Sequence, residues 1–296
     1  MKNNTTRLLI VLAVLIGVFA IVKLTRNNSR STSFRTELVN FSVEEADKIE
    51  ISSLTEHVQL TKSEGTWSVE TDQGVKAAME ANVRSLLSTL NTIRPSRLAA
   101  RSSSKWKDFS VDSTGTKVRV YGKGKTLTDI VLGRFGVEGQ RSFYTYVRLS
   151  EDEDVYVAAE FMKMSISTSV NDFRNNVMAR MNKDSITEIS FNYPDSSLVI
   201  RKADELWMKN DSVADSAAVA GYLNTLNIVS SRNFTAPPAT SKPDLNITYR
   251  FANGSEKQLS AYKEVVGWTI VSSENKEEVW NDENLFEKIF VASSHF

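Results

Sequence analysis

The chain has 296 residues, with 36 basic and 36 acidic side chains and a formal net charge of zero. This balance does not indicate a general polyanion-binding surface, and we expect no nucleic-acid partner. The sequence contains no cysteine, which excludes disulfides, thiolate metal sites and a cysteine nucleophile. Its two histidines, His57 and His295, are too few for a conventional zinc site built from several histidines.

The apolar segment near the N-terminus predicts a membrane-spanning helix. Residues 8–22 carry no charge, and residues 5–24 together supply the roughly 20 residues that a bilayer-spanning helix needs. A cleaved signal peptide is the competing interpretation, with a small-residue cleavage site that ends at Ala20. Because cleavage there would leave Ile21 and Val22 at the new terminus, an uncleaved signal anchor is favoured.

Basic residues lie on both sides of this segment and leave its orientation open. They are Lys2 and Arg7 before it, and Lys23, Arg26, Arg30 and Arg35 after it. The positive-inside rule alone would keep the C-terminal body in the cytoplasm. An apolar N-terminal segment ahead of a soluble domain, in contrast, generally directs export. Residues 25–33 are polar, without apolar periodicity, and predict a flexible tether.

The rest of the chain contains an internal similarity. Three apolar residues of the first half match three of the second at one constant offset of 140 residues: Val58, Leu60 and Trp67 correspond to Leu198, Ile200 and Trp207. This period is far too long for a solenoid repeat. It predicts a duplicated unit of domain size.

Both halves show the same expected order of elements. Alternating apolar residues predict a pair of strands, and an amphipathic helix follows at residues 75–93, ended by Pro95. The second helix is expected at residues 219–226, with Asp215 as its N-cap. More strands joined by hairpin-length turns come next. The final short helices are expected at residues 161–166 and 285–290.

We therefore predict an α+β fold, in which an N-terminal transmembrane helix is followed by two tandem homologous units. Each unit is expected to be a mostly antiparallel sheet with one amphipathic helix packed on it. The expected boundaries are a cytoplasmic stub and transmembrane signal anchor at residues 1–24, a linker at 25–33, a first repeat unit at 34–172 and a second at 173–296. Trp67 and Trp207 are expected to fill the two cores.

The sequence offers few candidates for chemistry. The acidic run Glu151–Asp154 could attract calcium, but its place between two expected strands favours a solvated hairpin tip. Basic residues around Trp106 could contact nucleic acid or an anionic glycan, but a loop from helix to strand explains them too. Gly133, Gly136 and Gly139 lack the Lys-Ser/Thr of a phosphate loop and are expected in turns. We predict no catalytic, cofactor-binding or metal-ligating residue, no cofactor and no enzymatic activity.

Besides the apolar N-terminus, six short segments of the chain follow a recognisable order. They are Lys62 to Trp67, Trp106 to Phe109, Ile130 to Gly133, Tyr144 to Val147, Val155 to Val157 and Asp172 to Arg174. This order resembles a bacterial family of membrane-anchored proteins known as domain of unknown function 4340. Some members of that family resemble accessory components of cell-envelope or gliding-type ABC transport systems. The resemblance implies an extracytoplasmic role with a protein partner and no catalytic residues.

We accordingly expect a non-enzymatic, single-pass protein of the cell inner membrane whose body faces the periplasm. Its expected role is that of a binding or scaffold protein of the bacterial cell envelope. The resemblance implies an accessory component of an ABC-type or gliding-associated transport system, with other envelope or transporter proteins as partners. One alternative stays open, a glycan, lipid or peptide binding module that uses the groove between the two repeat units.

Overall fold

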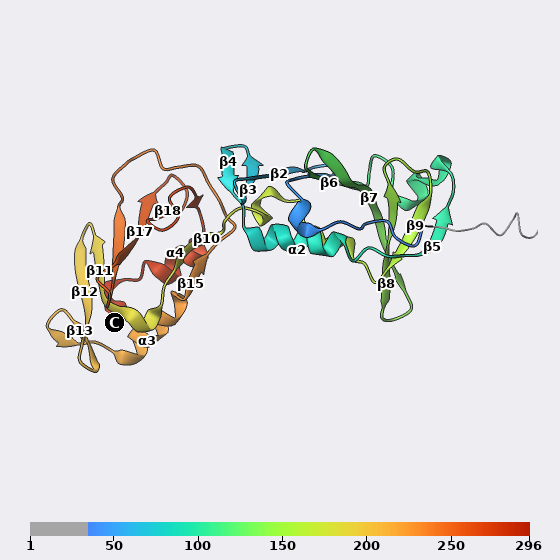
Figure 1. Ribbon diagram of the computed structural model, residues 1–296. Helices are drawn as coiled ribbons and strands as arrows, with labels where there is room; N and C mark the ends of the chain where they lie inside the picture. The colour runs from blue at the N-terminus through green and yellow to red at the C-terminus, as the bar shows by residue number, and fades with distance from the viewer. Residues whose placement is uncertain (1–34) are drawn as a thin grey trace, which may run out of the picture.

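The computed structural model describes residues 35–296, which fold into two sheet-based units (Figure 1). The first extends to about Phe173, and the second continues to the C-terminus. The stub and signal anchor expected at residues 1–24 and the linker expected at 25–33 lie outside the described residues.

The first unit is built on a nine-stranded antiparallel sheet between Lys48 and Ala159. In spatial order its strands are β4 (Gly74–Ala77), β3 (Thr66–Thr71), β2 (His57–Ser63), β1 (Lys48–Ser52), β6 (Thr116–Gly122), β7 (Lys125–Glu138), β8 (Ser142–Leu149), β9 (Val155–Ala159) and β5 (Pro95–Ala100). Apolar residues at every second position of β1 and β2 are buried, as expected for a sheet that packs one face on a core.

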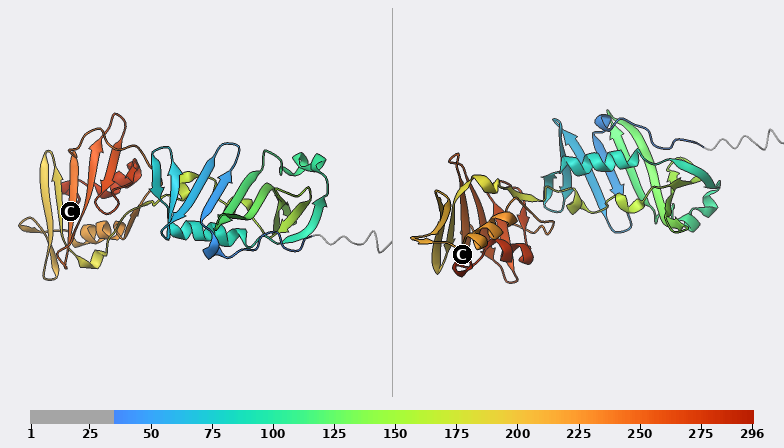
Figure 2. Two further views of the ribbon diagram at one scale, coloured as in Figure 1. Left: turned by 45° about the horizontal axis from the view of Figure 1, so that its top comes forward. Right: turned by 90° about the horizontal axis from the view of Figure 1, so that it is seen from below.

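Helix α2 (Glu80–Leu90) covers this sheet, and the right-hand panel of Figure 2 shows it lying across the sheet face. Its buried residues Val83, Leu86, Leu87 and Leu90 fall at helical spacing and join the core of the first unit. Trp67 of β3 is 4% exposed in the same core. Burial of this apolar stripe is what holds the helix, since an isolated helix of eleven residues is marginal in water.

The opposite face of β7, β8 and β9 is also covered. Val131, Tyr146 and Val157 are buried there, beneath the loop that carries Trp106 and Phe109. Short 3-10 turns shape this loop at η2 (Ser103–Lys105) and η3 (Lys107–Phe109). This end of the sheet therefore has core on both faces.

The second unit is built on an eight-stranded antiparallel sheet between Ile186 and Trp280. In spatial order its strands are β14 (Ser212–Val213), β13 (Leu206–Lys209), β12 (Ser196–Ala203), β11 (Ile186–Tyr193), β16 (Leu245–Phe251), β17 (Glu256–Lys263), β18 (Trp268–Ser272) and β19 (Val279–Trp280). A separate pair joins β10 (Val177–Arg180) to β15 (Ile228–Ser230). Helices α3 (Ser216–Thr225) and α4 (Glu283–Ile289) contribute to its core.

The two sheets share strand order and register. Ile49 of β1 pairs with Leu60 of β2, and Ile189 of β11 pairs with Ile200 of β12. Both residues of the second pair stand 140 positions after those of the first, the same offset that relates Trp67 to Trp207. On the other side, Ile49 faces Val120 of β6 and Ile189 faces Tyr249 of β16. The helices α2 and α3 follow at the same point of each unit.

The fold class predicted from the sequence is wrong in its stated form. Among residues 35–296 no helix is long and apolar enough to cross a membrane. The described part is mostly antiparallel sheet with three α-helices, and two of these, α3 and α4, lie in the second unit. One amphipathic helix for each sheet is therefore not the arrangement found.

Two helix boundaries are also wrong. Residues 74–77 form β4 rather than the start of a helix, because Gly74 turns the chain at a φ of +97° and Val75 pairs with Glu70 of β3. Val75 fits the apolar spacing of α2 but is exposed. At residues 161–166 the structure has only the 3-10 turn η4 (Lys163–Ser165). Asp215 does cap α3, and its carboxylate accepts from the backbone of Ala217 and Ala218.

A buried ion pair joins the two units where the chain passes between them. Arg174 donates through Nε to Oε1 of Glu278 at 3.1 Å and through Nη2 to Oε2. The two side chains are 4% and 2% exposed. The ring of Phe234 lies 3.8 Å from the Arg174 guanidinium carbon. Lys76 of β4 adds a hydrogen bond to the carbonyl of Glu277.

Replacing Arg174 with methionine should destabilise the protein by about 3–5 kcal/mol, because Glu278 would stay buried without its partner. The double variant Arg174→Met/Glu278→Leu should recover most of that loss, since an apolar pair often replaces a buried ion pair at little cost. Urea unfolding of the four members of this cycle measures both effects.

The control for this cycle is Arg84→Met, which removes an ion pair between Arg84 and Glu44 that is exposed on both sides. We expect it to change the free energy of unfolding by less than about 1 kcal/mol. If Arg174→Met lowers the free energy of unfolding by no more than Arg84→Met does, the ion pair at the junction does not stabilise the protein.

Candidate functional site

The groove expected between the two units is filled at its centre. The side chains of Arg174, Glu278 and Phe234 occupy it, and a backbone bridge pairs Phe234 with Trp280 of β19. Two hollows of about 320 and 220 Å³ flank this junction. The smaller hollow is crossed by the ion pair of Arg232 with Asp172, at 2.9 Å.

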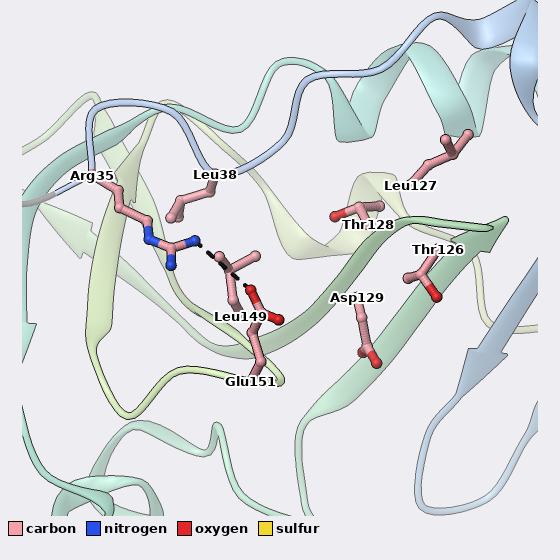
Figure 3. A pocket seen from close by; sticks show the side chains of 8 residues that line it. All are labelled: Arg35, Leu38, Thr126, Leu127, Thr128, Asp129, Leu149 and Glu151. Carbon is pink, nitrogen blue, oxygen red and sulfur yellow. Dashed lines mark ion pairs between the residues drawn. The ribbon is translucent and has the colours of Figure 1, made fainter. Parts of the chain in front are cut away.

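A third hollow, of about 400 Å³, lies where the N-terminal segment of the described chain crosses β7 and β8 (Figure 3). Arg35 reaches from that segment toward the β8–β9 turn, with Nη1 4.0 Å from Oε1 of Glu151 and Nε 3.7 Å from Oδ2 of Asp152. The acidic run Glu151–Asp154 therefore lies at a hairpin tip, and two of its carboxylates face a guanidinium.

The polar groups at the base of this hollow come from β7. Asp129 accepts from Ser150 and, at 2.9 Å, from Nε of Arg119. Burial opposes the charge of Asp129, but these hydrogen bonds and the charges of Lys117 and Arg119 hold its pKa below the usual value. Neighbouring Thr128 is buried, and its hydroxyl has no partner among the described residues. Asp129 is therefore a carboxylate fixed in an ion-pair network with Arg119 and Lys117.

A further hollow, of about 500 Å³, lies at one end of the strands of the first unit. We call it the Lys163 pocket. It is bounded by the β1–β2 turn at residues 53–55, the beginning of β6, Phe135 of β7 and the segment 163–168. Leu54 and Met164 on its rim are 73% and 69% exposed.

Lys163 is the single titratable side chain among the residues that line this pocket. No carboxylate of the described chain lies within ion-pair distance of its ammonium group. Burial lowers the pKa of Lys163, because desolvation disfavours the charged amine. Lys163 is not among the candidate residues predicted from the sequence.

The other groups singled out in the sequence have structural surroundings. Trp106 stacks on the guanidinium of Arg148 at 3.8 Å and donates to the carbonyl of Glu153. Arg148 is 6% exposed and donates to carbonyl oxygens of four residues, Val111, Leu149, Ser150 and Asp152. The aromatic of the basic run therefore covers a buried arginine.

The glycines were expected in turns, and this is wrong for two of the three. Gly133 and Gly136 lie inside β7, and only Gly139 follows it. A Cβ at Gly133 would come 2.3 Å from the carbonyl oxygen of Phe109, so glycine is needed there for close approach of the covering loop. The pairing of β7 with β8 shifts register between Leu132 and Phe135.

The two histidines lie far apart, and neither sits in a cluster of catalytic type. Nδ1 of His57 is 3.0 Å from the hydroxyl of Ser52, and the ring of His295 packs on Tyr222 and Phe296. Across residues 35–296 no group of three or more His, Cys, Asp or Glu is placed to hold a metal ion.

The pKa of Lys163 gives a pH-dependent prediction for stability. Because its pKa is lowered on folding, the unfolded chain binds more protons between the folded pKa and the unfolded value of about 10.4. Stability should therefore rise with pH across that window. Lys163→Met should be more stable than the natural chain near neutral pH, and the difference should shrink as the pH approaches about 10.

Urea unfolding at several pH values measures this difference. Lys125→Met, at an exposed position at the beginning of β7, provides the matched control. A difference between Lys163→Met and the natural chain that does not change with pH would show that Lys163 is not desolvated on folding.

One of three comparisons with known proteins gives a match. The family described as "Domain of unknown function (DUF4340)" matches residues 67–248, more than half of the chain. The matched region begins at Trp67 of β3 and ends within β16, so it includes parts of both units. No curated protein and no solved structure matches the chain. The chain therefore belongs to the DUF4340 family.

Proposed function

We propose that this chain is a non-enzymatic binding or scaffold protein of the bacterial cell envelope. In this proposal it works at the inner membrane with its body facing the periplasm, as an accessory component of an ABC-type or gliding-associated transport system. The apolar residues 8–22 and the resemblance in segment order support the location. Neither feature names a partner.

The observation that carries a scaffold role is the junction between the units. A scaffold has to present two surfaces at a fixed separation, and the buried pair of Arg174 with Glu278 restricts how the two sheets meet. The direct link of Lys76 to the Glu277 carbonyl and the bridge between Ala78 and Arg174 restrict it further. Neighbouring domains generally move relative to one another unless the interface between them is large and well packed. These contacts therefore reduce the relative motion of the two units.

The charged groups around the hollows support binding rather than catalysis. Asp129 is held by Arg119 and Ser150, and Asp172 by Arg232. A general acid or base works best with a pKa near the operating pH and with its proton free to move. The pKa of Asp129 is shifted down, away from that range, and its oxygens are engaged by Arg119 and Ser150.

The second candidate is a binding module for a glycan, lipid or peptide between the units. Its support is the hollow of about 320 Å³ beside the junction, lined by His57, Gln59 and Arg174 among others. That volume is near the lower end of ligand pockets, which run from roughly 300 to 1,000 Å³. The scaffold role is favoured because the centre of the groove is filled.

Chemical crosslinking in intact cells, followed by affinity capture in detergent, tests the scaffold role. The natural chain should recover envelope or transporter proteins. Arg174→Met should recover several-fold less, since a loosened junction no longer holds two contact surfaces at one separation. Arg84→Met serves as the control and should recover as much as the natural chain.

Recovery of the monomer alone would count against a scaffold role. If Arg174→Met recovers as much partner protein as the natural chain, partner binding does not depend on the junction. In the same cells, protease added to spheroplasts should degrade the body while a cytoplasmic protein stays intact. Protection of the body would place it on the cytoplasmic side.

A further inference from the structure

The Lys163 pocket lies in the first unit, away from the junction, and the proposed scaffold role does not use it. Its walls come from four separate segments of one sheet end, the β1–β2 turn, β6, β7 and the segment after β9. A volume of about 500 Å³ falls within the range of small-molecule sites.

Four of the residues that line the pocket are apolar. Ile166 is 5% exposed and lines it together with Phe135, while Leu54 and Met164 are largely exposed. The pairing of β7 with β8 shifts register just before Phe135. Leu54 and Met164 therefore leave apolar surface open to solvent at the pocket, where a ligand could contact it.

Six of the ten residues that line the pocket are polar, five with hydroxyl groups and one with an amine. Lys163 brings a half-buried ammonium without a carboxylate partner in the described chain. Thr116, only 3% exposed, also lines the pocket. No acidic side chain lines the pocket, so it offers one positive charge and hydroxyl groups to a ligand.

This chemistry disfavours a peptide. Extended peptides are bound through main-chain hydrogen bonds to a free sheet edge. The strands at the pocket, β1, β6 and β7, each have a neighbour on both sides in the sheet. An acyl chain needs no such hydrogen bonds, and it gains from apolar contact alone.

We propose that the Lys163 pocket binds a single acyl chain with an anionic head, such as a free fatty acid or a monoacyl phosphate. The chain lies against Phe135 and Ile166 between Leu54 and Met164. The carboxylate or phosphate pairs with the Lys163 ammonium, and the Thr116 hydroxyl donates a hydrogen bond to it. The ligand is a single molecule taken from solution, not the surface of a bilayer.

The test uses the full-length chain in phosphatidylcholine nanodiscs. In one arm, a palmitic acid that carries a photoreactive diazirine is added to the solution. In the other arm, the diazirine is carried by phosphatidylglycerol within the nanodisc. After irradiation, mass spectrometry maps the crosslinked peptides. We expect the free fatty acid to label peptides that contain residues 53–55 and 163–168.

Three variants separate the contributions of head and chain. Lys163→Met should reduce labelling by the fatty acid on the order of tenfold, because a charge-assisted hydrogen bond is lost, and Lys163→Arg should retain it. Met164→Glu places a carboxylate at the exposed rim and should reduce labelling to a similar degree. Lys125→Met should label like the natural chain. Equal urea midpoints for Met164→Glu and the natural chain confirm that the fold is kept.

Three outcomes would overturn the proposal. These are labelling by phosphatidylglycerol only, labelling of other segments by the free fatty acid, and equal labelling of Lys163→Met and the natural chain. The result does not depend on the scaffold role, because partner recovery by Lys163→Met is measured separately in the crosslinked cells. Loss of labelling with unchanged partner recovery supports the pocket proposal.

Discussion

The two-unit body depends on one interaction, the buried ion pair of Arg174 with Glu278. Moving two charges out of water costs free energy, and this cost is offset only when both groups are fully paired. Arg174 meets that condition with two nitrogens on the two carboxylate oxygens and with the ring of Phe234 against its planar face. A lysine has no planar fork with which to make the same set of contacts. The pair therefore stabilises one arrangement of the two sheets relative to others.

The pairing of the central strands could be predicted from sequence because burial there is local and periodic. Ile49, Ile51, Val58 and Leu60 alternate along two strands, and all four are fully buried in one core. Their constant offset to the second unit reproduces the register of β11 with β12. The start of α2 could not be predicted, because Val75 fits both a helical stripe and a hairpin strand. The turn at Gly74 decides between the two, and its effect depends on pairing with β3.

The candidate sites were harder to predict than the strands, since burial of a charge depends on distant segments. Arg148 is covered by Trp106, more than forty positions earlier, and Arg174 by Glu278, more than a hundred positions later. Lys163 stands between two methionines in a segment expected to be helical, where a lysine is ordinary. It becomes unusual only when the β1–β2 turn and β7 close around it. The runs of like charge that stand out in the sequence lie instead at a hairpin tip and in a covering loop, where water or ion pairs satisfy them.

The junction also shows how two units of the same strand order come to differ. In the first unit, the strand after helix α2 is β5. It pairs with β9 and so covers the edge of the sheet at β9. In the second, the strand after the helix is β15, which pairs with β10 instead. Residues 233–235 lie along the edge of β19 instead. Phe234 forms a backbone bridge with Trp280, and the backbone N–H of Thr235 donates a hydrogen bond to the carbonyl of Val279. This difference in edge pairing places Phe234 against Arg174, so the ring contact at the junction depends on the edge of β19 that β15 leaves uncovered.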